Sequence, residues 1–169
     1  MVLTQLELLA LLQKEVRILV HLASKVDRST VDYRPTPKQR SVLELLRYLS
    51  IMGPQLVLAA KGNAFNVESW TAATKAAEAR DFDQTVAAIA AQEQEYATLL
   101  GDMSDADFRA EMNAFDGSKT TRGAFIVNLV LCGHAAYRTQ LFCYLKSCGR
   151  DELSTWNLWR GMDAPAAAV

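Results

Sequence analysis

The chain has 169 residues, the size of one globular domain, and its composition is that of a folded protein. Half of the residues are hydrophobic and 22% are charged, which argues against disorder. Eighteen basic and nineteen acidic side chains give a net charge of −1, so charge gives no reason to expect nucleic acid or a membrane as a partner. We therefore expect a single domain over residues 1–169.

The first twenty residues do not resemble a secretory signal, because charged side chains interrupt the apolar stretch that such a signal needs. The longest uncharged run covers residues 123–137, fifteen positions, whereas a membrane-spanning helix needs about twenty. We therefore expect a cytoplasmic protein. In a reducing compartment Cys132, Cys143 and Cys148 are expected to be free thiols, with the first and second buried and inert.

Hydrophobic residues recur at three- and four-residue spacing through long segments free of glycine and proline, which predicts helices. The first helix is expected over residues 4–27. An extended linker is expected over residues 28–40, where Pro35 and Pro37 prevent a continuous helix.

The second helix is expected to begin at Ser41, because Ser41 and Glu44 have the spacing of a reciprocal capping box. Within it, the dipeptide Gly53-Pro54 is expected to kink the helix or to end a segment. A loop over residues 62–70 and a possible short helix over residues 71–79 complete this part of the chain.

Asp81 is the expected N-cap of a third helix that runs to about Leu100. Residues 101–119 are predicted to form a loop with at most one helical turn, started by Ser104. The fourth helix is expected over residues 121–148, followed by Gly149 as its left-handed cap.

These elements predict an all-α fold: a four-helix bundle with a long crossover between the first and second helices and a short extra helix between the second and third. The linker over residues 28–40 is long enough to let the first two helices lie parallel. The fourth helix is apolar around most of its circumference, which predicts a central position or a homodimer interface. The tail over residues 151–169 contains Trp156 and Trp159 and is expected to dock on the bundle, with a frayed alanine-rich end.

Three stretches of the sequence resemble the DinB/YfiT-like superfamily of metal-binding four-helix bundles. The stretch YRPTPKQRSVLELLRYLS, residues 33–50, is similar to the start of the second helix in that family. The stretch GHAAYRTQLFCYLKSCG, residues 133–149, is similar to a histidine-bearing run of the fourth helix, and the tail NLWRGMDAP resembles the tails of some members. Together they cover about a quarter of the chain in the order that the fold requires.

The resemblance implies a divalent metal held on three histidines, one from the second helix and two, four residues apart, from the fourth. In this sequence those positions fall on Tyr48, Gly133 and Tyr137. Glycine has no side-chain ligand, and neutral tyrosine is a poor ligand for zinc or nickel near pH 7. We therefore predict a divergent member that lacks the histidine triad and binds no metal, with zinc or nickel at a rearranged site as the alternative.

Five residues are candidates for lining what remains of the pocket: Tyr48, Glu93, His134, Tyr137 and Arg138. His134 could act as a general base or residual ligand, or could simply pack in the core. Glu93 falls in the apolar stripe of the third helix, where it could pair with Arg138, hydrogen-bond Tyr48, or mark an edge that touches solvent. The two tyrosines could offer hydroxyls or fill the volume with aromatic bulk.

Arg138 is expected to brace the fourth helix. His21, the other histidine, shares a face with Lys14, Arg17 and Lys25 and is expected to be solvated.

Two functions stay open at this level. The first is a metal-free small-molecule-binding or interaction module that forms a homodimer. The second is a thiol-dependent transferase or isomerase with a rearranged site around His134, since better-characterised relatives use their metal site for chemistry with a low-molecular-weight thiol.

Overall fold

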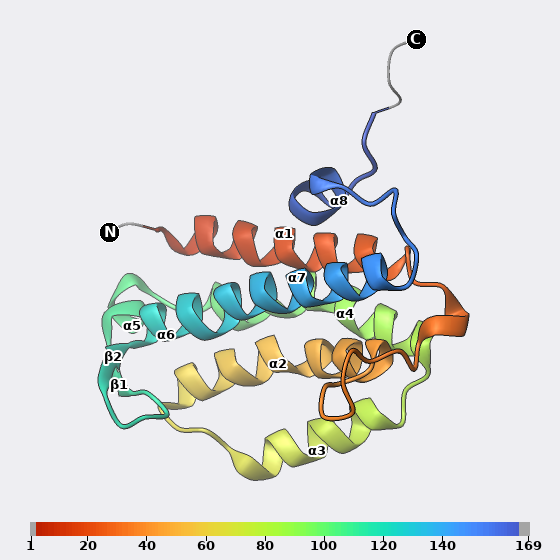
Figure 1. Cartoon of the computed structure of the whole chain (residues 1–169). Helices are drawn as coiled ribbons and strands as arrows, with labels where there is room; N and C mark the ends of the chain where they lie inside the picture. Colours follow the sequence, from red (N-terminus) through yellow and green to blue (C-terminus); the bar gives the residue numbers. More distant parts are fainter. Residues whose placement is uncertain (1–2, 166–169) are drawn as a thin grey trace.

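The computed structural model describes residues 3–165, and these residues form an all-α helical bundle (Figure 1). The prediction of an all-α four-helix bundle is confirmed. The long helical segments are α1 (Gln5–Ala23), α2 (Val42–Gly62), α4 (Phe82–Gly101), and a final segment made of α6 (Arg122–Phe125), the π-helical η2 (Ile126–Leu131) and α7 (Cys132–Ser147). The predicted fraying at the end of the chain concerns residues 166–169, which lie outside the described residues.

Shorter elements connect and cover the long helices. They are the 3-10 turn η1 (Arg28–Thr30), the helices α3 (Val67–Glu78), α5 (Asp105–Arg109) and α8 (Thr155–Arg160), and the strands β1 (Glu111–Asn113) and β2 (Lys119–Thr121). The extra helix predicted between the second and third helices is α3, which begins earlier than expected because Asn66 caps it through its side chain.

The helices α1 and α2 lie on opposite sides of the bundle, and each packs against both α4 and α7 (Figure 1). The side chains at the centre are fully buried and come from all four segments. They include Leu12, Leu19, Leu45, Leu49, Ile89, Val130 and Leu141. This burial of apolar stripes is the main source of stability for such a bundle.

The first two helices run in opposite directions in Figure 1, so the expectation that the linker lets them lie parallel is wrong. The linker is not extended either: the amide of Leu43 donates to the carbonyl of Val31, and the amide of Val42 donates to the carbonyl of Tyr33. These bonds turn the chain back into α2. The parallel consecutive pair is instead α2 and α4, because α3 carries the chain back along the bundle (Figure 1).

Two predicted helix starts are confirmed by their capping geometry. Ser41 accepts a hydrogen bond from the amide of Glu44, whose carboxylate accepts from the amide of Ser41. Asp81 and Gln84 form the same reciprocal pair at the start of α4. Each pair satisfies two amides that would otherwise lack partners at the helix end.

The dipeptide Gly53-Pro54 does not end α2, which continues as one helix from Val42 to Gly62. Both residues are buried at the centre of the bundle. Proline removes one backbone hydrogen bond, but packing on both sides of α2 holds the helix together across that gap. The alternative in which this dipeptide ends a segment is therefore wrong, whereas the kink stays a prediction.

Residues 101–119 contain more structure than the predicted loop. Ser104 caps α5 as expected, and a two-stranded hairpin follows in which Met112 lies opposite Thr120. Met112 is buried and anchors the hairpin to the bundle. The absence of strands was a wrong prediction here, because three-residue strands are too short to produce a recognisable alternation.

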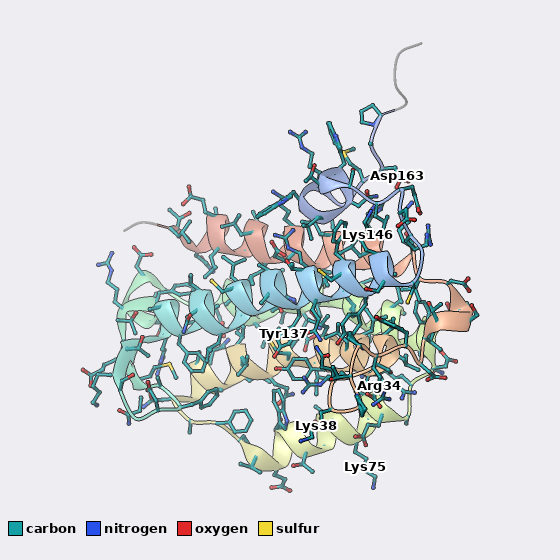
Figure 2. The ribbon with its side chains drawn as sticks, in the orientation of Figure 1. Arg34, Lys38, Lys75, Tyr137, Lys146 and Asp163 are labelled. Atoms are coloured by element: carbon teal, nitrogen blue, oxygen red, sulfur yellow. The ribbon has the colours of Figure 1, made fainter. Side chains whose placement is uncertain are left out.

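The helix α8 lies against α1 (Figure 1). The side-chain amide of Asn157 donates to Nε2 of His21 over 3.0 Å and to Asp163 over 2.9 Å. Lys25 on α1 forms an ion pair with Asp163, which lies beside α8 in Figure 2. His21 is therefore half-buried beneath the tail, not solvated, and burial followed by the nearby charge of Lys25 lowers the pKa of its imidazole.

Among the described residues, α2 is the helix long and apolar enough to cross a membrane by length and composition. However, 67% of its most apolar window is buried inside the bundle, which is how a core helix of a soluble protein is covered.

Candidate functional site

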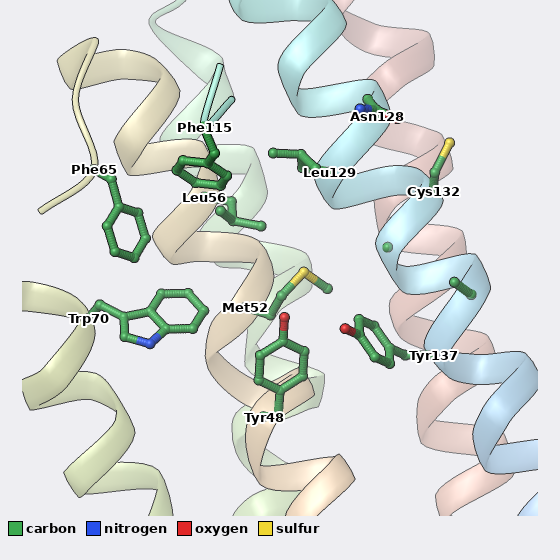
Figure 3. A pocket seen from close by; sticks show the side chains of 12 residues that line it. Tyr48, Met52, Leu56, Phe65, Trp70, Phe115, Asn128, Leu129, Cys132 and Tyr137 are labelled. Carbon is green, nitrogen blue, oxygen red and sulfur yellow. The ribbon is translucent and has the colours of Figure 1, made fainter. Parts of the chain in front are cut away.

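An open cleft of about 700 Å³ lies between α2 and the η2–α7 segment, beside the start of α3 (Figure 3). Its lining is mostly aromatic and aliphatic and contains no charged side chain. The lining residues are Tyr48, Met52, Leu56, Phe65, Trp70, Phe115, Asn128, Leu129, Cys132, Gly133, Ala136 and Tyr137. Such a concave, mainly apolar surface with a few polar groups is the usual form of a small-molecule site.

Five aromatic rings form a continuous series along this cleft. The ring centroids of Tyr137 and Tyr48 are 5.1 Å apart, and Tyr48 and Trp70 are 6.2 Å apart. Trp70 is followed by Phe65 at 5.3 Å and Phe65 by Phe115 at 5.4 Å. Neighbouring rings are tilted or edge-to-face, which is the arrangement that their quadrupoles favour.

Helical spacing explains the α2 and α7 walls of the cleft. Tyr48, Met52 and Leu56 are four residues apart on α2 and therefore share one face. On the opposite wall, Gly133 and Ala136 have little or no side chain, which leaves the volume open.

Two turns bring the remaining rings to the mouth of the cleft. Asn63, with a φ of 55°, ends α2 in the left-handed conformation and turns the chain toward Phe65. Gly117, with a φ of 81°, closes the hairpin that carries Phe115.

The polar end of the cleft is formed by two phenols, whose hydroxyls point toward one another (Figure 3). The pKa of Tyr48 is raised, mainly by burial and then by hydrogen bonding and charge interaction with Tyr137. The guanidinium of Arg40 lies 4.1 Å from the ring centroid of Tyr48, as a cation–π contact outside the cleft lining. Tyr48 therefore stays protonated at neutral pH and is able to donate a hydrogen bond.

The three positions that the resemblance assigns to metal ligands, Tyr48, Gly133 and Tyr137, do come together around this cleft. Their donor chemistry does not fit a divalent ion. A Cβ atom on Gly133 would lie 3.4 Å from the sulfur of Met52, so a thioether and two phenols surround the place where imidazoles are implied. Within residues 3–165, no three histidine, cysteine or acidic side chains cluster in a way that could hold a metal.

His134 lies behind the cleft, not in it. Its side chain is fully buried, and Nε2 is 2.6 Å from the hydroxyl oxygen of Tyr96 on α4. Burial lowers its pKa to about 4, so the imidazole is neutral at pH 7. Nδ1 has no hydrogen-bond partner among the described residues. The core interpretation of His134 therefore describes its position better than the general-base interpretation.

Glu93 is also distant from the cleft, because it lies on the edge of α4 that faces α1. Its carboxylate pairs with Arg17 on α1 at 2.7 Å and remains partly exposed. The expected partners, Arg138 and Tyr48, are elsewhere, so only the interpretation of Glu93 as a solvent-touching edge matches its position.

Arg138 is buried between α7, α1 and α8 and braces them. Its guanidinium forms an ion pair with Glu15 at 2.7 Å and donates to the carbonyl of Leu158. It also lies 4.8 Å from the ring centroid of Trp159. Of the five candidate residues, Tyr48 and Tyr137 line the cleft together, whereas Glu93, His134 and Arg138 each lie elsewhere.

Sequence reasoning missed Phe65, Trp70 and Phe115, which form the outer half of the aromatic series. The available signal was the presence of large aromatic side chains in segments predicted as loops. It also misplaced Cys132 and Cys143, which are exposed on α7 instead of buried. Cys132 lines the cleft.

The fold and the cleft define an all-α bundle with an aromatic groove between its second and last long helices. No protein-family model and no curated protein matches the sequence. Among solved structures, the crystal structure of a DinB-like protein, YjoA from Bacillus subtilis, is similar to this chain with a TM-score of 0.68. The match has 17% sequence identity and covers 87% of this chain and 94% of that chain. The protein therefore has a DinB-like fold, as the resemblance predicted.

Proposed function

We propose that this protein is a small-molecule-binding module on a DinB-like fold, and that it works without a bound metal. The observation that carries the proposal is the uncharged aromatic cleft at the position where the resemblance implies a metal pocket. Rings from α2, α3, α7 and two connecting turns converge there (Figure 3).

The solvent exposure of the outer aromatic rings supports the proposal that the cleft binds a ligand. The side chains of Phe65 and Phe115 are 37% and 60% exposed, although both are large and apolar. Contiguous apolar surface of this kind is uncommon unless it binds something. A ligand that covers it gains roughly 25 cal/mol for each Å² of apolar surface removed from water.

The alternative, a thiol-dependent transferase with a site around His134, has less support. The imidazole is buried against Tyr96 and does not line the cleft. A general base must come within hydrogen-bond reach of its substrate. No other histidine lies near the cleft, because His21 is held beneath α8.

We also propose a cytoplasmic homodimer that uses the outer face of the last helix. The exposed positions from residue 128 to residue 143 are all uncharged: Asn128, Cys132, Ala136, Thr139 and Cys143. The first three also line the cleft, so the proposed dimer interface borders the proposed ligand site. Light scattering at micromolar concentration is expected to give about twice the chain mass, and a monomer of 18.7 kDa would contradict this part of the proposal.

The binding function is tested with Nile red, a neutral apolar dye that brightens when it leaves water. We expect saturable binding to the wild-type protein and its loss in Gly133→Leu, because the new side chain must enter the cleft beside Met52. The matched control is Gly101→Leu, where an added Cβ meets nothing within 4 Å. Equal dye binding by both variants would refute the cleft as the site.

The metal-free part of the proposal is tested on protein purified without a histidine tag. We expect no stoichiometric zinc or nickel, and no change in melting temperature after treatment with a chelator. Stoichiometric metal that disappears in His134→Ala would overturn it and would favour the transferase.

A further inference from the structure

We infer that the cleft selects a planar, uncharged aromatic molecule that carries a hydrogen-bond acceptor, of the aryl ketone, quinone or lactone type. This inference rests on the proposed binding function and names the chemistry of its ligand. It follows from three properties of the lining: its charge, its shape and the position of its hydroxyl groups.

The lining excludes ionic ligands by its composition. None of its side chains is charged, so an ion that enters loses water without gaining a counter-ion. A cationic ligand, which aromatic rings alone can attract, would also meet the positive charge of Arg40 against the ring of Tyr48. A carboxylate would find only neutral donors in the lining itself, because Arg40 lies outside it. An uncharged ligand avoids these costs.

The shape of the lining favours a flat ring system. The rings of Tyr48 and Trp70 are inclined by 65° and those of Tyr48 and Tyr137 by 69°, so neighbouring walls present faces and edges in turn. A planar aromatic ligand that lies in the cleft can contact the cleft-facing sides of these rings in the same edge-to-face and offset geometries that the rings use with one another.

The hydroxyl groups favour a ligand with an acceptor. The hydroxyls of Tyr48 and Tyr137 face one another at one end of the cleft (Figure 3). When one phenol donates to the other, the proton of the second hydroxyl is left free to donate. A carbonyl oxygen on the ligand accepts that proton, whereas a pure hydrocarbon leaves it without a partner in an apolar surrounding.

The experiment compares four naphthalenes of similar size by isothermal titration calorimetry with the full chain. They are 2-acetylnaphthalene, 2-ethylnaphthalene, 2-naphthoate and trimethyl(naphthalen-2-ylmethyl)ammonium. We expect the ketone to bind most tightly, roughly fivefold more tightly than the hydrocarbon, because the ketone gains one net hydrogen bond that the hydrocarbon cannot form. The two ions are expected to bind more weakly than either neutral probe.

The double variant Tyr48→Phe/Tyr137→Phe is expected to bind the ketone and the hydrocarbon with equal affinity. Each single variant is expected to reduce the ketone preference, which keeps the test available if the double variant does not fold. Tyr33→Phe, outside the cleft, should retain the full preference.

The outcomes separate the two proposals. If the ketone and the hydrocarbon bind the wild type equally, or if an ion binds most tightly, the inference about ligand chemistry is wrong while the binding function stands. If no naphthalene binds and Nile red does not bind either, both are wrong. A ketone preference that survives in the double variant would also overturn the inference, because the phenols would not be its cause.

Discussion

The Nε2 atom of His134 lies 2.6 Å from the hydroxyl oxygen of Tyr96, and this pair joins α7 to α4 inside the bundle. Both side chains are fully buried. They pack against Gly53 of α2, where an added Cβ would overlap the hydroxyl of Tyr96 and lie 2.9 Å from Nε2 of His134. Three long helical segments therefore meet at one hydrogen bond directly behind the cleft.

Replacement of Tyr96 by phenylalanine should destabilise the fold by about 1–3 kcal/mol, because the buried imidazole of His134 loses its partner. Urea unfolding at pH 7.5 measures the loss. Tyr33→Phe is the control, since Tyr33 is half-buried and makes an edge-to-face contact with Tyr144, and a change below about 0.5 kcal/mol is expected there. A Tyr96→Phe protein as stable as the wild type would show that the bond contributes nothing.

Gly53→Ala should be strongly destabilising, by roughly 2–4 kcal/mol, because the new methyl group has no space beside Tyr96. The loss should be smaller in the Tyr96→Phe background, where the overlapping hydroxyl is absent. Gly101→Ala, at the end of α4 with open space around its Cβ, should be neutral or slightly stabilising. Thermal unfolding of the wild type, Gly53→Ala, Tyr96→Phe and the double variant tests this coupling, and strictly additive losses would argue against it.

The buried His134 should make stability depend on pH. Its pKa falls from 6.5 to about 4 on folding, so between these values the unfolded chain binds a proton that the folded protein does not. The stabilisation is therefore complete above pH 6.5 and is lost as the pH falls toward 4, by about 3 kcal/mol in total.

The measurement is the difference in unfolding free energy between pH 7.5 and pH 5. It should shrink markedly in His134→Gln. This difference should shrink less in His21→Gln, because the pKa of His21 is lowered in the same direction but its side chain is less buried. An unchanged pH dependence in His134→Gln would contradict the prediction, because another group would then be responsible.

The sequence predicted the long helices well because their signals are local. Ser41 with Glu44 and Asp81 with Gln84 marked two starts at the residues where the structure has them. Apolar spacing then identified the buried faces. The relative directions of the helices could not be predicted in this way, because they depend on contacts beyond the helices themselves. These contacts include the packing of α3 and the hydrogen bond from the amide of Leu43 to the carbonyl of Val31.

The candidate site was predicted only in part, for the same reason. The resemblance placed Tyr48, Gly133 and Tyr137 around one cleft, and the structure agrees. Apolar spacing alone does not tell toward which neighbouring element a polar residue at the edge of the stripe points. Glu93 points toward Arg17 on α1, and His134 points toward Tyr96 in the core, so neither reaches the cleft.

Loss of Arg138 should release the tail from the bundle. In Arg138→Leu the carboxylate of Glu15, whose pKa is already raised by burial, is left without its cation, at a cost of about 3–5 kcal/mol. The contacts of Arg138 with Leu158 and Trp159 disappear as well. Hydrogen exchange of the α8 amides should accelerate, and Glu15→Gln added to Arg138→Leu should recover part of the stability. Continued protection of α8 would show that other contacts hold it.

The convergence of Tyr48, Gly133 and Tyr137 allows a metal site to be built. The triple variant Tyr48→His/Gly133→His/Tyr137→His should bind nickel or zinc, because three imidazoles would surround one cleft. At a hundredfold excess over the dissociation constant, binding adds about 2.7 kcal/mol, which for a domain of this size raises the melting temperature by roughly 5–10 °C. The variant Tyr48→His/Tyr137→His, which lacks the third ligand, should respond much less. A folded triple variant with no metal-dependent shift would mean that these three positions do not converge around the cleft.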